Sequence, residues 1–126
     1  MWRRGVGFLL VLFFLAPMGI RADGMSGYTT LMRVEFVLEC MREHPGTQYE
    51  MMSKCSCVLD QLAKKYSGEA FVEARTMAQA ISIAGERGSA LRDNEEAHKQ
   101  ARAYREALAM AETDCFLRPS AIEEQN

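Results

Sequence analysis

The chain has 126 residues, of which 15 are basic and 17 acidic, and its formal net charge is −2. This length suits a single domain, and the charge balance excludes the strongly basic surface that nucleic-acid binding requires. The four cysteines form an even set, which in an exported protein predicts two disulfides.

The first 22 residues have the order of a cleavable secretory signal. Two arginines precede the apolar run 6–16, and Pro17 ends that run shortly before the small residue Ala22. An uncleaved anchor is the alternative, but a membrane-spanning helix needs about 20 apolar residues, and this run has 11. We therefore expect residues 1–22 to be removed and residues 23–126 to form one periplasmic domain without a membrane attachment.

Removal of the signal makes the protein more acidic. The segment carries three of the 15 basic residues and none of the acidic ones, so the net charge of the mature domain falls to about −5. This charge argues against nucleic acid and against anionic membrane surfaces as partners.

Apolar residues at helical spacing predict the first two helices. A loose lead-in over residues 23–29 precedes a helix from about Thr30 to His44, which Pro45 ends. Thr47–Glu50 has the form of a capping box for the second helix. The expected buried face of the first helix consists of Leu31, Val34, Val37, Leu38 and Met41. The expected stripe of the second consists of Met51, Met52, Cys55, Val58, Leu59, Leu62 and Tyr66.

Two further helices follow a break at residues 67–68. The third ends at the turn Gly85–Gly88, and the fourth runs from about Asn94 to Phe116. The expected face of the third consists of Ala70, Phe71, Ala74, Met77, Ala78 and Ile81. The expected seam of the fourth consists of Ala97, Ala101, Tyr104, Leu108, Ala111 and Cys115. Because no long stretch alternates with period two, we predict an all-α, four-helix domain tied by two disulfides, with a frayed tail at residues 118–126.

The positions of the cysteines on the helices favour one disulfide pairing. Cys55 and Cys115 lie on apolar stripes, whereas Cys40 and Cys57 lie off them. Face matching therefore favours Cys55–Cys115 in the core and Cys40–Cys57 at the flank. Distance from the turn at residues 45–46 favours the pairing of Cys40 with Cys55 instead, because Cys55 lies nearer the level of Cys40. We prefer the face argument. Structural disulfides are also preferred over a redox or soft-metal role for Cys-x-Cys, since the two residues point apart in mid-helix.

Glutamates recur every four residues at Glu35, Glu39 and Glu43, with Glu50 expected nearby across the turn. Clustered carboxylates suit a hard cation such as calcium or a lanthanide, so these four residues are the candidate metal ligands. A solvated acidic face is the alternative. A copper site would instead use thioether and imidazole groups, here Met41, His44, Met51 and Met52. We disfavour copper because methionines on apolar stripes are ordinary core residues.

The sequence contains no catalytic constellation. It has two histidines, His44 and His98, and neither belongs to a zinc-ligand pair, while nucleophile-elbow and phosphate-loop motifs are also missing. His44 is interpreted as a residue near a helix C-terminus that interacts with the helix dipole. We predict a protein that is not an enzyme.

Residues 54–63 contain a Cys-Ser-Cys-x-x-Asp core, and residues 85–88 form a Gly-Glu-Arg-Gly turn. With residues 39–41 and 71–76, these segments resemble small exported proteins of proteobacteria and methylotrophs, over roughly residues 34–92. Such proteins are often encoded near periplasmic alcohol dehydrogenases that use pyrroloquinoline quinone with calcium or a lanthanide. The resemblance implies an accessory role, either in handling a metal or cofactor or in assisting the quinoprotein dehydrogenase or its cytochrome.

The leading hypothesis is thus a periplasmic, non-enzymatic accessory protein of a quinoprotein alcohol-oxidation system that binds a lanthanide or calcium. A protein-binding module such as an immunity protein or a stress chaperone is the first alternative, because small, acidic, disulfide-tied helical domains suit that role as well. A structural component of the cell envelope is the second.

Overall fold

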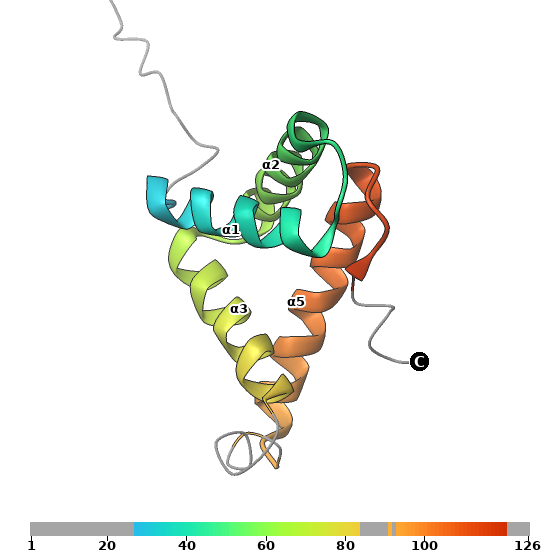
Figure 1. The fold of residues 1–126 in the computed structure, drawn as a ribbon. Coiled ribbons are helices and arrows are strands. Elements are labelled where there is room, and N and C mark those ends of the chain that lie inside the picture. Colours follow the sequence, from blue (N-terminus) through green and yellow to red (C-terminus); the bar gives the residue numbers. More distant parts are fainter. Residues whose placement is uncertain (1–26, 84–90, 92, 121–126) are drawn as a thin grey trace, which may run out of the picture.

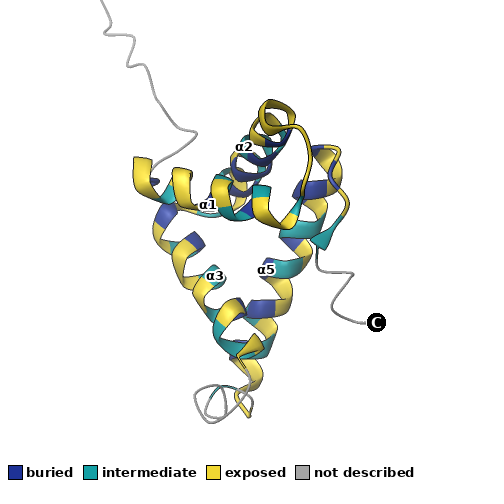
Figure 2. Cartoon of the chain, viewed as in Figure 1, coloured by how far each residue is buried: buried dark blue, intermediate teal, exposed yellow. Residues whose placement is uncertain are grey.

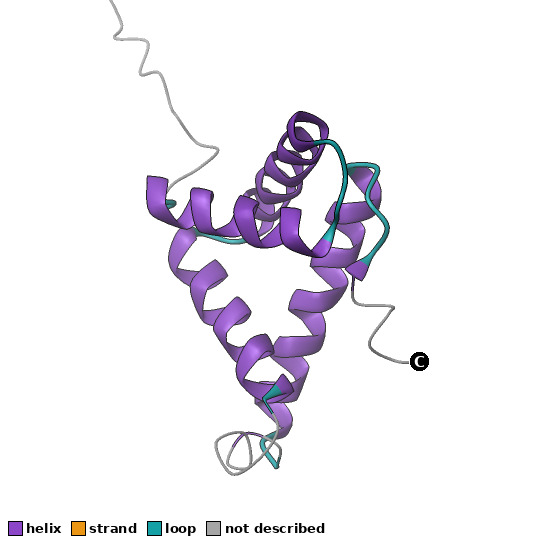
Figure 3. Cartoon of the chain, in the orientation of Figure 1, coloured by secondary structure: helices purple, strands orange, loops and turns teal. Residues whose placement is uncertain are grey.

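The fold is all-α, as predicted. A computed structural model describes three parts of the chain, namely residues 27–83, 91 and 93–120. Within these parts the structure has four helices and no strand (Figure 3). The expected signal at residues 1–22 and the turn Gly85–Gly88 lie outside the described residues, as does the chain after Ser120.

The helices are arranged around an open triangle (Figure 1). They are α1 (Thr30–Glu43), α2 (Gln48–Lys65), α3 (Gly68–Ser82) and α5 (Glu95–Asp114). α3 and α5 form an antiparallel pair that is close at one end and diverges toward the other, and α1 lies across the open end. α2 packs on α1 and on α5. Within the described ranges, no helix combines the length and the apolar character needed to cross a membrane.

The core is centred on the ring of Phe71 in α3, which is fully buried. Its ring centroid lies 5.3 Å from that of Tyr28, 5.8 Å from that of Phe36 and 6.2 Å from that of Tyr104. The expected stripe of α2 is confirmed except at Met52, which is 39% exposed. The expected seam of α5 is buried at Ala97, Ala101, Tyr104, Ala111 and Cys115, and alanine there lets the α3–α5 pair approach closely.

The expected buried face of α1 is wrong in part, since only Val37 and Met41 of its five residues pack against the core. The buried residues of α1 are Phe36 and Cys40, whereas the side chains of Leu31, Val34 and Leu38 are 65%, 49% and 56% exposed. Phe36 is turned inward by its edge contact with Phe71, and Cys40 by its bond to α2. Figure 2 shows the outward side of α1 as exposed along much of its length.

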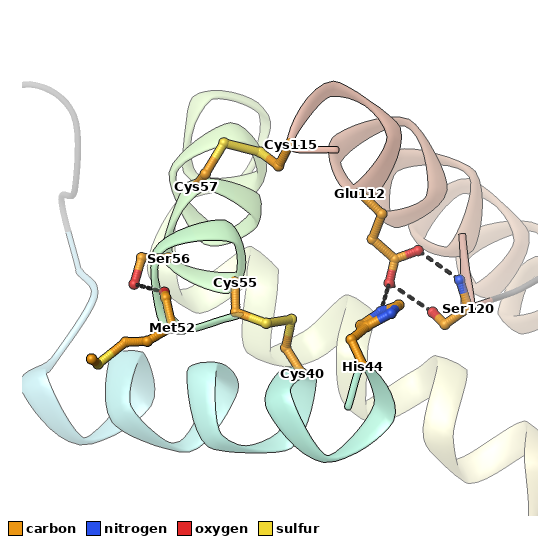
Figure 4. Close-up of a disulfide and its surroundings, with 9 residues drawn as sticks. All are labelled: Cys40, His44, Met52, Cys55, Ser56, Cys57, Glu112, Cys115 and Ser120. Atoms are coloured by element: carbon orange, nitrogen blue, oxygen red, sulfur yellow. Dashed lines mark hydrogen bonds and ion pairs between the residues drawn. A yellow bond between two sulfur atoms is a disulfide. The ribbon is translucent and has the colours of Figure 1, made fainter. Parts of the chain in front are cut away.

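The disulfides join Cys40 to Cys55 and Cys57 to Cys115, so the preferred pairing is wrong and the alternative based on distance from the turn is right (Figure 4). The Cα atoms of the two pairs lie 5.8 Å and 5.9 Å apart. The face argument failed because it placed Cys40 off the buried side of α1. Cys40 is only 6% exposed and meets Cys55, which is completely buried.

The expected capping box at the start of α2 is also wrong. Thr47 is the N-cap residue, but its side chain makes no capping hydrogen bond. The carboxylate of Glu50 pairs instead with Lys54, one turn along the helix, at 2.8 Å. The capping box occurs at α1, where the Thr29 hydroxyl accepts from the backbone N–H of Met32 at 3.2 Å.

The lead-in is packed rather than loose where the structure describes it. Tyr28 is 5% exposed, and its hydroxyl donates to the carbonyl of Tyr66 at 3.1 Å. Gly27 has a φ of +83°, a left-handed conformation that favours glycine. Its backbone lies directly against Gly68, the first residue of α3. This contact holds the start of α1 against the start of α3.

Replacing Gly68 with alanine is expected to lower the free energy of unfolding by about 2–3 kcal/mol, the upper range for overpacking. A Cβ atom at this position would overlap the carbonyl of Gly27, and backbone atoms cannot move away as a flexible side chain can. Gly46→Ala is the matched control, because the added atom would meet the side chain of Met51 at 3.0 Å. Chemical denaturation followed by circular dichroism should show the larger loss for G68A, and an equal loss for both variants would contradict this account.

The start of the predicted frayed tail is ordered, so that part of the prediction is wrong. After α5, the backbone N–H of Phe116 donates to the carbonyl of Thr113 at 3.1 Å, and that of Leu117 to the carbonyl of Glu112 at 2.8 Å. These two bonds form a Schellman motif, with Phe116 in the left-handed conformation at φ 62°. The chain then turns back along α5 and brings Ser120 to Glu112.

Candidate functional site

A cleft of about 420 Å³ lies between α1, α3 and α5. Its lining includes five charged side chains from three helices, namely Glu39, Glu43, Arg75, Arg105 and Glu112. Aromatic rings complete the wall at Phe36 and Tyr104. Burial raises the pKa of Tyr104 above its ordinary value of 10.0.

Glu112 of α5 is another residue that lines this cleft. At 2% exposure it is the one buried charged side chain among the described residues. Its Oε1 accepts from Nε2 of His44 at 3.1 Å and from the hydroxyl of Ser120 at 2.7 Å. Its Oε2 accepts from the backbone N–H of Ser120 at 2.8 Å. Figure 4 shows His44 and Ser120 converging on the carboxylate, whose burial is thus compensated by three hydrogen bonds.

Glu43, His44 and Glu112 form a candidate metal site. One ligand atom from each can be chosen so that all three lie within 4.8 Å of one another. His44 immediately follows the last residue of α1, and its backbone N–H caps that helix by donating to the carbonyl of Cys40 at 2.9 Å. Glu43 also lines a second hollow beside His44 and Ser120, so the site is bordered by two recesses.

Two arginines that line the cleft already have partners. Arg75 of α3 makes an ion pair with Glu39 of α1, and its guanidinium lies 6.0 Å from the ring centroid of Phe36. Arg105 donates to the carbonyl of Ala78 at 3.0 Å. These contacts fix α1, α3 and α5 around the cleft.

The four glutamates predicted as metal ligands are not brought together. Glu35 is exposed on α1, and Glu50 pairs with Lys54 on α2. Glu39 binds Arg75 and also accepts from the side chain of Gln79 at 3.3 Å. Glu43 alone of the four belongs to the cluster around Glu112. A calcium or lanthanide ion, which takes six to eight oxygen ligands, is therefore poorly matched by this row.

Sequence reasoning missed Glu112 altogether and assigned His44 only to a helix end. Glu112 is four residues from Leu108 and next to Ala111 on the apolar seam of α5. A charged residue on such a seam must find a buried partner, and this is the signal that could have revealed it. Its partner could not be deduced, because His44 is 68 positions away in the sequence.

The cluster offers two carboxylates and one imidazole, a set that can hold a divalent cation or share a proton. The two disulfides fix the helices that carry it, since α1 is tied to α2 and α2 to the end of α5. Disulfides persist in oxidising compartments, so this framework is compatible with an extracellular or periplasmic protein. No protein-family model matches the chain, and no curated protein or solved structure is significantly similar to it.

Proposed function

We propose that this protein is a non-enzymatic accessory protein of an exported quinoprotein alcohol-oxidation system, and that it binds a divalent metal ion. The observation that carries the metal proposal is the convergence of Glu43, His44 and Glu112 beside a charged cleft. The accessory role rests on the resemblance of residues 34–92 to small exported proteins of methylotrophs and other proteobacteria.

The ligand set favours a first-row transition metal such as Mn²⁺ or Zn²⁺. Imidazole nitrogen and carboxylate oxygen together suit these ions, whereas calcium and lanthanides prefer oxygen alone. Nε2 of His44 lies within hydrogen-bond distance of Oε1 of Glu112, at 3.1 Å. Protons and metal ions compete for imidazole and carboxylate ligands, so the affinity should fall as the pH is lowered.

Isothermal titration of the protein with Mn²⁺, Zn²⁺, Ca²⁺ and La³⁺ tests this proposal. We expect a 1:1 complex with Mn²⁺ or Zn²⁺, with a dissociation constant on the order of 10 μM. Repeating the titration at a lower pH should show weaker binding, because protons compete for the same ligands. The same titration with Ca²⁺ and La³⁺ should be weaker.

Two glutamate variants separate this site from the row predicted from sequence. Glu43→Gln removes a proposed ligand from an exposed position and should weaken Mn²⁺ or Zn²⁺ binding about 10-fold or more. Glu35→Gln is the matched control on the same helix and should leave the affinity unchanged. Equal affinities for E43Q and the unchanged protein, or no binding of any ion below the millimolar range, would refute the metal proposal.

The accessory role is tested separately. Purified protein should form a complex with a quinoprotein alcohol dehydrogenase or with its cytochrome, detected by sedimentation velocity. The E43Q variant distinguishes the two parts of the proposal, because it should retain this association while losing metal. If neither partner binds, the accessory role fails whatever the outcome of the metal titration.

A further inference from the structure

The outward side of α1 carries apolar residues that no described part of the chain covers. Leu31, Val34 and Leu38 follow one another at spacings of three and four along this side, and each side chain is about half exposed or more. We call these three residues the α1 stripe. Figure 2 shows much of this segment of α1 as exposed. Scattered exposed apolar residues are ordinary, but a continuous row on one helix face is typical of an interface.

Two opposite charges border the α1 stripe on the same flank. At 100° per residue, Glu35 and Arg42 lie within about 20° of each other around the helix, just beyond Leu31. They are seven residues apart, which is about 10 Å along the axis. Both are exposed, and within the described residues neither has an ion pair. The other flank carries Val37 and Met41, which are uncharged.

This charge pattern is complementary to itself in one orientation. When two copies of a helix pack antiparallel about a two-fold axis, each flank meets the same flank of its partner. Glu35 then faces the partner's Arg42, and Arg42 faces the partner's Glu35. A parallel pair would place the charged flank against the apolar flank and would leave all four charges unpaired.

We propose that the protein forms a two-fold symmetric dimer in which the α1 stripe of one copy packs antiparallel on that of another. The axis passes near Leu38, midway between Glu35 and Arg42, so Leu38 meets its own copy at the centre. Two reciprocal ion pairs border the contact on one side, and apolar residues border it on the other. The proposal is independent of the metal site, because that site lies toward the cleft between α1, α3 and α5.

The dimer is expected to be reversible. Permanent dimers bury about 2,000 Å² or more, and a contact made mainly by one helix from each copy covers less than that. We therefore expect a dissociation constant on the order of 10–100 μM. Sedimentation velocity of the processed protein, from about 1 μM to several hundred micromolar, should show a rise from the monomer mass to twice that mass.

Four variants test the arrangement. Leu38→Glu places two like charges at the axis and should abolish the dimer. Glu35→Arg or Arg42→Glu alone creates two repulsive pairs and should weaken association at least 10-fold. The double variant E35R/R42E restores both pairs with reversed sign and should return the dissociation constant to within about threefold of the original. Glu106→Arg, a reversal of an exposed charge on α5, is the control and should change nothing.

All substitutions lie at exposed positions, and circular dichroism should confirm that each variant keeps its helix content. A protein that stays monomeric over the whole concentration range would overturn the proposal. The α1 stripe would then have to be covered by a different partner. A double variant as weak as the single variants would overturn the antiparallel arrangement. A dimer that survives L38E would show that association uses another surface.

Discussion

Replacing Cys57 and Cys115 together with alanine is expected to lower the free energy of unfolding by about 4 kcal/mol, the largest effect of any substitution proposed for this protein. The disulfide closes a loop of 58 residues, and the entropy that a cross-link removes from the unfolded chain grows with loop length. The Cys40–Cys55 bond closes a loop of 15 residues. Removing it should cost about 3 kcal/mol.

Chemical denaturation of the two double variants, C57A/C115A and C40A/C55A, measures this difference directly. The order of the losses is the informative result, because each variant removes two sulfur atoms and retains the other disulfide. Reduction of both disulfides with excess thiol should destabilise the chain more than either variant does. A greater loss for C40A/C55A would contradict the assignment of the stabilisation to loop closure.

Replacing Glu112 with alanine is expected to cost about 3–4 kcal/mol, because it leaves several buried hydrogen-bonding groups unsatisfied. The change leaves His44 and both donors of Ser120 without their acceptor inside the fold. Glu112→Gln keeps the shape and one carbonyl oxygen, so it should cost roughly half as much. Thermal denaturation followed by circular dichroism would measure both losses.

Glu106→Ala is the matched control for E112A because it removes the same side chain from an exposed position of the same helix. Its expected effect is within about 0.5 kcal/mol. If E112A and E106A have similar stabilities, the hydrogen bonds of Glu112 contribute little to folding. Its position would then be better explained by the metal site alone.

Most of the helical framework could be predicted from the sequence. The stripes of α2 and α5 are local patterns, and the residues that form them are buried together in the structure. α1 is the helix for which the apolar pattern does not predict burial. Its most apolar face, with Leu31 and Leu38, is exposed, because burial is decided by which partners are present and not by hydrophobicity alone. The wrong partner predicted for Cys40 has the same cause, because Cys40 was placed off the buried side of α1.

The candidate site was less predictable than the fold. Glu43 was among the predicted ligands, but its neighbours in the structure are not the other glutamates of α1 and α2. Helical spacing places residues on one side of one helix, whereas the cluster combines residues from the end of α1 and the end of α5. It depends on the crossing of these helices and on the turn that returns Ser120 to Glu112, and neither has a local signature.

The covalent connections of this small domain are unevenly distributed. Both disulfides include α2, while the whole of α3 lies inside the loop that Cys57 and Cys115 close. α3 can therefore detach from α5 without separating the ends of that loop. Hydrogen exchange should reveal it as a subglobal opening unit, with amides that exchange before those of α2. Because the chain stays closed, reattachment requires only a short search and should be fast.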